Sequence, residues 1–159
     1  MIAVGIDPGT IRTGWGVLRR DGSRIVRLGS GVIRLGEGRP LEIRLAHLQD
    51  ELEAVLAAHG PDEAAVEDLF FAKNAMSALK LGHARGVILA VLARRGLAVR
   101  SYPPALVKRS VVGRGRASKG QIRKVMQAIL GMESPPAEDE ADALAIALCH
   151  ANASRVPAP

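Results

Sequence analysis

Four carboxylates occupy positions from which the folded chain could bring them together. Asp7 ends an apolar run that begins at Ile2, and Glu67 ends a shorter apolar run. Asp139 and Asp142 are three residues apart, so they share one face of a helix. Hard cations such as Mg²⁺ bind carboxylate oxygens, and two such ions about 4 Å apart can activate a water and stabilise a leaving oxygen. The four acids together therefore predict a divalent-metal site for hydrolysis.

Each of these acids has a simpler explanation when it is taken alone. An Asp before Pro-Gly is common in turns, which describes Asp7. Strand alternation points Glu67 and Asp68 to opposite sides, so either one fits an exposed strand end. The helix macrodipole favours acids in a first turn, which accounts for residues 138–140. The metal-site interpretation depends on the four acids acting as a set.

Positive charge is concentrated in one part of the chain. The formal net charge is +6 and the pI is about 10.2. Ten Lys or Arg residues and no Asp or Glu lie between Arg94 and Met132. Such a tract suits a polyanion such as nucleic acid, although a merely solvated basic surface has the same composition. A basic tract beside an acidic cluster is what a nuclease needs, because the first binds phosphates and the second binds cations.

The composition is typical of a globular protein. Hydrophobic residues make up 48% and aromatic residues 3% of the chain, so the core is expected to consist of Val, Ile, Leu and Ala. The single cysteine, Cys149, excludes an internal disulfide. The N-terminal apolar run is too short for a secretory signal, and the run over residues 86–93 is far shorter than the roughly 18 residues of a membrane span. We expect a soluble, cytoplasmic protein without membrane association.

The first third of the sequence favours strands. Asp21-Gly22 marks a hairpin turn, and Gly29 and Gly31 suggest a bend or bulge. Three antiparallel strands are predicted, over Ile2–Asp7, Thr13–Leu18 and Arg24–Leu35.

Beyond Pro40 the pattern alternates between helices and strands. Apolar residues at three- and four-residue steps indicate amphipathic helices. The predicted elements are a helix over 40–59, a strand over 63–69, a helix over 74–95, a strand over 97–102, and helices over 118–130 and about 137–151. This order predicts an α/β protein with a mixed sheet and helices on its faces. Residues 1–153 are expected to form one domain, with a frayed tail over residues 154–159.

Five blocks of sequence resemble the RuvC family in content and in order. They are Gly5–Thr10 with Thr13–Gly16, Glu67–Asn74, Ser77–Gly82, Tyr102–Pro104 with Val107-Lys108, and Asp139–Ala145. An Asp-Pro-Gly-Thr turn alone is unspecific, whereas five blocks that span nearly the whole chain are highly specific. The chain is therefore similar to a crossover junction endodeoxyribonuclease, an enzyme that resolves Holliday junctions.

The resemblance implies a fold and an activity. The fold is ribonuclease-H-like, with a mixed five-stranded sheet of three antiparallel strands followed by two parallel ones, flanked by helices. The activity is that of a structure-specific endonuclease, a homodimer whose two active sites nick opposed strands of a four-way DNA junction symmetrically. The products carry 5′-phosphate and 3′-hydroxyl ends that a ligase can seal, in recombination and DNA repair. Cooperation with the RuvA–RuvB branch-migration complex is implied as well.

The resemblance also assigns roles to individual residues. The implied catalytic metal ligands are Asp7, Glu67, Asp139 and Asp142, with two Mg²⁺ or Mn²⁺ ions per subunit. The first acid of the helical pair varies in the family, so the relative roles of its two members stay open. Phe70 matches an aromatic residue that stacks on a base near the cut. Lys108 and Lys119 match lysines near the scissile phosphate, where a cation binds phosphate or stabilises transition-state charge.

Further DNA contacts are predicted on physical grounds. Phe70 and Phe71 are the only phenylalanines, they follow Glu67 in a predicted loop, and Lys73 comes next. Stacking of a base on an aromatic ring contributes roughly 1–3 kcal/mol. A buried pair of phenylalanines that anchors the loop is the alternative. Backbone contacts are predicted for Arg114, Arg116 and Arg123, each of which a solvated basic surface also explains.

Two other function classes share parts of this pattern. Actin-like ATPases and sugar kinases use a similar Asp-x-Gly-Thr turn, but they need a duplicated domain, for which 159 residues leave no room. A module that binds branched DNA without cutting it would share the basic tract. It would not need the four acids.

Overall fold

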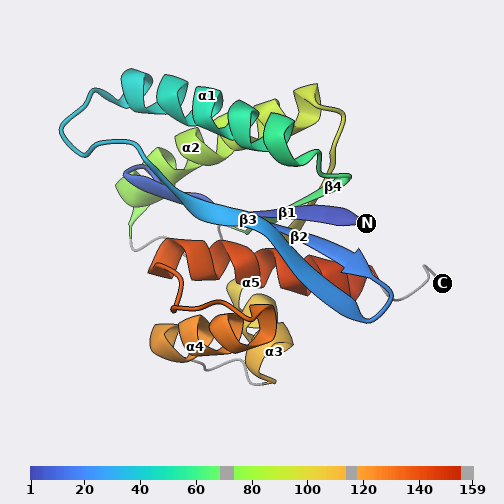
Figure 1. Cartoon of the computed structure of the whole chain (residues 1–159). Coiled ribbons are helices and arrows are strands. Elements are labelled where there is room, and N and C mark those ends of the chain that lie inside the picture. The colour runs from blue at the N-terminus through green and yellow to red at the C-terminus, as the bar shows by residue number, and fades with distance from the viewer. Residues whose placement is uncertain (69–73, 114–117, 155–159) are drawn as a thin grey trace.

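The computed structural model of the chain describes residues 1–68, 74–113 and 118–154 (Figure 1). Its elements are β1 (Ile2–Asp7), β2 (Arg12–Asp21), β3 (Arg24–Arg34), α1 (Leu41–His59), β4 (Glu63–Glu67), α2 (Ala75–Arg94), β5 (Ala98–Tyr102), α3 (Pro104–Val112), α4 (Lys119–Leu130) and α5 (Glu138–Ala153). The predicted tail lies outside the described residues from 155 onward.

The strands form one mixed sheet in the order β3-β2-β1-β4-β5. β1, β2 and β3 pair antiparallel, whereas β4 is parallel to β1 and β5 is parallel to β4. The predicted arrangement is confirmed. Gly22 closes the β2–β3 hairpin at a φ of 59°, a conformation that glycine adopts without strain. The predicted irregularity is also present, because Val17 and Leu18 pair with Gly29 and Arg27, so Leu28 is the extra residue of a β-bulge.

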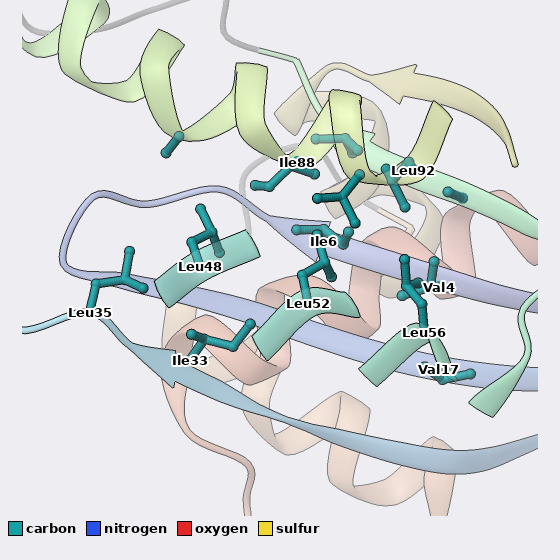
Figure 2. Packing of buried hydrophobic residues seen from close by; sticks show 14 residues of the cluster. Val4, Ile6, Val17, Ile33, Leu35, Leu48, Leu52, Leu56, Ile88 and Leu92 are labelled. Atoms are coloured by element: carbon teal, nitrogen blue, oxygen red, sulfur yellow. The ribbon is translucent and has the colours of Figure 1, made fainter. Parts of the chain in front are cut away.

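Helices cover the two faces of the sheet unequally. α1 and α2 lie on one face, and α5 lies on the other with α3 and α4 beyond it (Figure 1). The first core joins leucines of α1 and residues of α2 to Val4 and Ile6 of β1 (Figure 2). The second core joins α3, α4 and α5 to Ala65 of β4. Residues of one strand therefore alternate between the two cores, as strand geometry requires.

α5 is buried on nearly all sides. Ala141 and every residue from Ala143 to Ala151 are buried, because the sheet lies on one side and α3 and α4 on the other. A helix in such a position must be apolar all round. The predicted apolar stripe over Ala141, Leu144, Ala145 and Leu148 is confirmed.

Glycines of β1 and β2 let α5 rest directly on the sheet. A Cβ at Gly5 would lie 2.3 Å from the carbonyl oxygen of Ala143, and one at Gly14 would lie 1.9 Å from that of Asp139. Gly16, the partner of Gly5 across the two strands, would place a Cβ 2.7 Å from Leu144. For Gly5 and Gly14 the nearest atoms belong to the helix backbone, which cannot move independently of the helix. These glycines set the height of α5 above the sheet.

The sequence prediction missed α3. Pro103-Pro104 was interpreted only as the end of β5, whereas Pro104 occupies the first turn of the helix, where its missing N–H is not needed. Gly113 ends α3 in the left-handed conformation. The correction matters because Lys108 lies on this helix.

α2 has one buried face and one exposed face. Ala84, Ile88, Val91 and Leu92 are buried, whereas Met76 and Leu79 are 60% and 58% exposed. Its length and composition would allow α2 to cross a membrane. That is weak evidence, since helices of soluble proteins pass the same test.

Replacement of Gly5 by alanine should destabilise the fold. The added methyl group would overlap the backbone of α5, and such overpacking costs about 1–3 kcal/mol. We expect the melting temperature of Gly5→Ala to fall by roughly 2–12 °C. Gly120→Ala is the matched control, because a Cβ there meets nothing within 4 Å and alanine favours the helix. Equal melting temperatures for Gly5→Ala and the wild type would contradict the proposed contact.

Candidate active site

Asp7 and Glu67 lie side by side at one edge of the sheet. β1 and β4 are parallel neighbours with Ile6 opposite Val66, so the next residue of each strand is one of the two acids. Strand alternation places Asp7 on the same face as Gly5, and Glu67 on the same face as Ala65. That face is the one covered by α5. The structure therefore brings the two strand-end acids close together.

α5 brings the other two acids to this edge. Gly14 pairs with Asp7 across β1 and β2, and the carbonyl of Asp139 lies directly over Gly14. The first turn of α5 is thus above the end of β1. Asp142, one turn further along, interacts electrostatically with both Asp7 and Glu67. Acids from three separate parts of the chain therefore lie at this end of the sheet, within range of one another's charge.

The far end of α5 is fixed by a buried polar chain. The hydroxyl of Tyr102 and Nδ1 of His150 are 2.8 Å apart, and Nε2 of His150 lies 2.7 Å from a carboxylate oxygen of Glu63. His150 is fully buried. These contacts connect α5 to the start of β4 and the end of β5. The helix that carries two acids is thereby tied to the strand that carries Glu67.

Burial and mutual repulsion make three of the acids reluctant to ionise. Burial raises the pKa of Asp7 well above its ordinary value, and the charges of Glu67, Asp142 and Asp139 raise it further. Burial, followed by the charge of Asp142, raises the pKa of Glu67. Burial also raises the pKa of Asp142, against the opposing effect of Lys119. A bound cation would relieve both costs.

Asp139 has a different partner. Its carboxylate forms an ion pair with Nε of Arg12, at 3.1 Å. Across residues 1–68, 74–113 and 118–154, no three His, Cys, Asp or Glu side chains are already arranged around a common point as metal ligands. The donor chemistry nevertheless fits a hard divalent cation, because the acids that converge here offer carboxylate oxygens only. Arg12 was not predicted from the sequence, where nothing distinguishes it from the other arginines.

Two lysines lie close enough to act on the acids. Lys119, the first residue of α4, lowers the pKa of Asp7, Glu67 and Asp142, and Lys108 of α3 lowers that of the latter two. Lys119 also forms an ion pair with Glu138. The hydrogen bond within this pair is the main reason that the pKa of Lys119 is raised and that of Glu138 is lowered. Both lysines therefore lie within electrostatic range of the acids.

Of the remaining predicted DNA contacts, only Arg123 lies within the described residues. Arg123 donates from Nε to the carbonyl oxygen of Pro136 at 2.7 Å, which links α4 to the segment before α5. Its role in DNA binding stays a prediction. Phe70, Phe71, Lys73, Arg114 and Arg116 lie outside the described residues.

Comparisons with known proteins agree on one family. The model of the family described as crossover junction endodeoxyribonuclease RuvC matches residues 3–150. A relative of that name from Sorangium cellulosum is 54% identical over 97% of this chain and 86% of its own length. Another, from Azorhizobium caulinodans, is 50% identical over 94% and 88%.

Solved structures give the same result. The T. thermophilus RuvC in complex with Holliday junction substrate has a TM-score of 0.90 at 34% identity, over 98% of this chain and 95% of that chain. A yeast mitochondrial Holliday junction resolvase, at 16% identity and a TM-score of 0.66, shares the fold.

In the absence of divalent cations, removal of one acid should stabilise the protein. The stabilisation should be larger at high pH. In Asp7, Glu67 and Asp142 the folded-state pKa is raised, so stability falls as pH rises from the ordinary values near 4 through the raised ones. The loss is complete above them. In EDTA, we expect Asp7→Asn to raise the melting temperature at pH 8 by about 2–8 °C, and by less at pH 5. Thermal unfolding followed by circular dichroism measures both values.

Asp50→Asn, at an exposed position on α1, is the control and should show no such pH-dependent gain. Addition of Mg²⁺ or Mn²⁺ at pH 8 should raise the melting temperature of the wild type more than that of Asp7→Asn. If neither cation stabilises the wild type, the metal-site assignment is wrong.

Proposed function

The chain belongs to the RuvC family of crossover junction endodeoxyribonucleases, and from this premise we propose that it resolves four-way DNA junctions by paired symmetric nicks. The products are 5′-phosphate and 3′-hydroxyl ends, and the reaction serves recombination and DNA repair. The family assignment leaves no reason to retain an ATPase or a sugar kinase. Residues 1–153 act as one nuclease domain in this proposal.

The convergence of the acids carries the proposal. Asp7 and Glu67 share a face and an edge of the sheet, and α5 is pressed onto that face through the glycines beneath it. Lys119 and Lys108 add positive charge beside the acids. Phosphodiester hydrolysis needs both features, because cations must be held and an anionic substrate must approach them.

The family depends on divalent metal ions, and the acids of this chain fit that requirement. Asp7, Glu67 and Asp142, with Asp139, would hold two Mg²⁺ or Mn²⁺ ions per subunit. Bound there, such ions would supply the chemistry of hydrolysis, activation of a water and stabilisation of the leaving 3′-oxygen. Asp139 contributes once it is released from Arg12, which gives it a less direct role than Asp7.

The chain's own cations bind and orient the scissile phosphate. Lys119 has its ammonium group near Asp7 and Asp142, so it can contact a phosphate oxygen held at the acids. Its ion pair with Glu138 restricts where the ammonium group can lie. Lys108 of α3 lies within range of Glu67 and Asp142. A charge fixed in advance stabilises the transition state without further reorganisation.

Other DNA contacts complete the proposal. Phe70 stacks on a base near the cut, with Phe71 and Lys73 beside it in the sequence. Backbone phosphates are bound by Arg114, Arg116 and Arg123. The RuvA–RuvB complex supplies junctions to the enzyme. The protein acts on DNA in the cytoplasm as a soluble enzyme.

The exposed face of α2 supports a homodimer. Small residues line this face at helical spacing, and all of them are exposed: Ala75, Ala78, Gly82, Gly86 and Ala90. Met76 and Leu79 add apolar area. Small residues allow a second helix to approach closely, and exposed apolar area favours association. A two-fold dimer would match the symmetry of a junction and place two sites on opposed strands.

A charged side chain at this face should separate the subunits. We expect Gly86→Glu to shift the wild-type dimer to monomer in sedimentation velocity, because the carboxylate would be buried at the closest approach of the helices. Ile129→Glu on α4 is the control, since Ile129 is also exposed but lies on a different layer. A monomeric wild type at micromolar concentration would refute the dimer, and equal dissociation of both variants would refute the interface.

Cleavage of a labelled junction tests the function. We expect symmetric nicks with Mg²⁺ or Mn²⁺ on a four-way junction and far less cutting of linear duplex. Asp7→Asn should abolish nicking and still bind the junction, because it removes a metal ligand but no DNA contact. Asp68→Asn, the adjacent acid outside the cluster, should retain nicking. Binding without cutting by the wild type would instead favour a recognition module.

A further inference from the structure

A cleft of about 340 Å³ opens beside the acidic cluster. It lies between residues 9–12, which join β1 to β2, and the first turns of α2. Asp139 forms part of its wall, so the cleft adjoins the proposed active site. Apart from Asp139, no residue assigned above to metal or DNA binding lines this cleft.

The cleft exists because α2 extends past the end of its core. Ala84 and Ile88 are buried against the sheet, and the same face one to two turns earlier carries Ser77, Lys80 and Leu81. These residues line the cleft and pack against no core. The sequence therefore places a hydroxyl and a cation on the inner face of the helix, where further along it places only apolar residues.

The wall opposite α2 also carries positive charge. Arg12 lines the cleft, and its side chain is 57% exposed although it pairs with Asp139. Arg44 of α1 supports the same loop, since its Nη1 donates to the carbonyl oxygen of Thr10 at 2.7 Å. Among the described residues, neither Arg44 nor Lys80 has an ion-pair partner, and the first turn of α2 has no acid. Cations therefore outnumber carboxylates in and directly behind the cleft.

We propose that this cleft binds a backbone phosphate of the DNA strand that is being cut, with Lys80 and Ser77 as its contacts. A phosphodiester fits the chemistry, because Lys80 offers a charge, Ser77 offers a hydroxyl donor, and the cleft is open to solvent. The position beside Asp139 places this phosphate next to the one held at the acids. The contact fixes the register of the strand and takes no part in the chemical step. This inference rests on the proposed nuclease function.

The salt dependence of junction binding tests the proposal. Binding is measured by fluorescence anisotropy in the Asp7→Asn background, which prevents cutting, over a series of KCl concentrations. Loss of one phosphate contact lowers the slope of log affinity against log salt by about 0.9 and weakens binding roughly 5- to 10-fold near 0.1 M salt. We expect both effects for Lys80→Gln. Ser77→Ala should weaken binding less and leave the slope unchanged, because no charge is removed.

Arg94→Gln is the matched control. Arg94 is exposed on the last turn of the same helix, so the change in net charge is identical. A slope change in Lys80→Gln but not in Arg94→Gln supports the site, whereas equal effects indicate general electrostatics and overturn it. Unchanged melting temperature and sedimentation of Lys80→Gln confirm that fold and assembly are intact. Failure of the Asp7→Asn parent to bind a junction would instead refute the nuclease function itself.

Inorganic phosphate distinguishes a DNA contact from a site for free anions. If 20 mM phosphate (a roughly 100-fold excess over a submillimolar site) stabilises the wild type but not Lys80→Gln, and the salt slopes are equal, the cleft binds free phosphate and the proposal is wrong. In steady-state cleavage, the proposal requires Lys80→Gln to raise KM with kcat nearly unchanged.

Discussion

The direct contact between the backbone of α5 and the glycines of β1 and β2 is the constraint on which the active site depends. Gly5, Gly14 and Gly16 present no Cβ on the face that α5 covers, so the helix rests on the sheet itself. Gly14 is also the strand partner of Asp7, and it touches Asp139. The contact that packs the core is therefore the one that sets the distance between strand acids and helix acids. Packing and catalysis cannot be varied independently here.

The same contact imposes an energetic cost that the proposed function explains. A buried helix could begin with neutral residues. The first turns of α5 instead carry acids that lie near two further carboxylates, Asp7 and Glu67. Burial and repulsion both oppose their ionisation. The rest of α5 offsets this cost with an apolar surface buried on all sides and with the chain from Tyr102 through His150 to Glu63. The buried length of α5 therefore stabilises the fold, whereas the acids near its start destabilise it.

The sequence predicted those parts of the structure that local patterns determine. Strand alternation, helical spacing and turn residues predicted the sheet and four of the helices, and the apolar stripe placed α5 correctly. α3 was missed because a proline pair was interpreted as a stop, although Pro104 begins a helix equally well. Arg12 and the cleft beside it were missed for a different reason. No local pattern distinguishes Arg12 from the other arginines. The cleft depends on how far α2 extends past its buried residues, and no local pattern encodes that distance.

α2 joins the two proposals about how DNA is held. Its outer face carries small and apolar residues for a second subunit, and its inner face, past the end of the core, carries Ser77 and Lys80. Both faces belong to one helix of 20 residues, so they keep a fixed position relative to each other. In the proposed dimer, the two-fold axis at the outer face would therefore fix the separation of the two phosphate clefts, and with it the separation of the two acidic clusters. Selectivity for a junction over linear duplex follows from that separation. One strand must enter each site at the same time, and only strands at the matching distance can do so. In this proposal the four acids hold the metal ions that cleavage requires, and α2 determines which pair of strands can reach the two sites together.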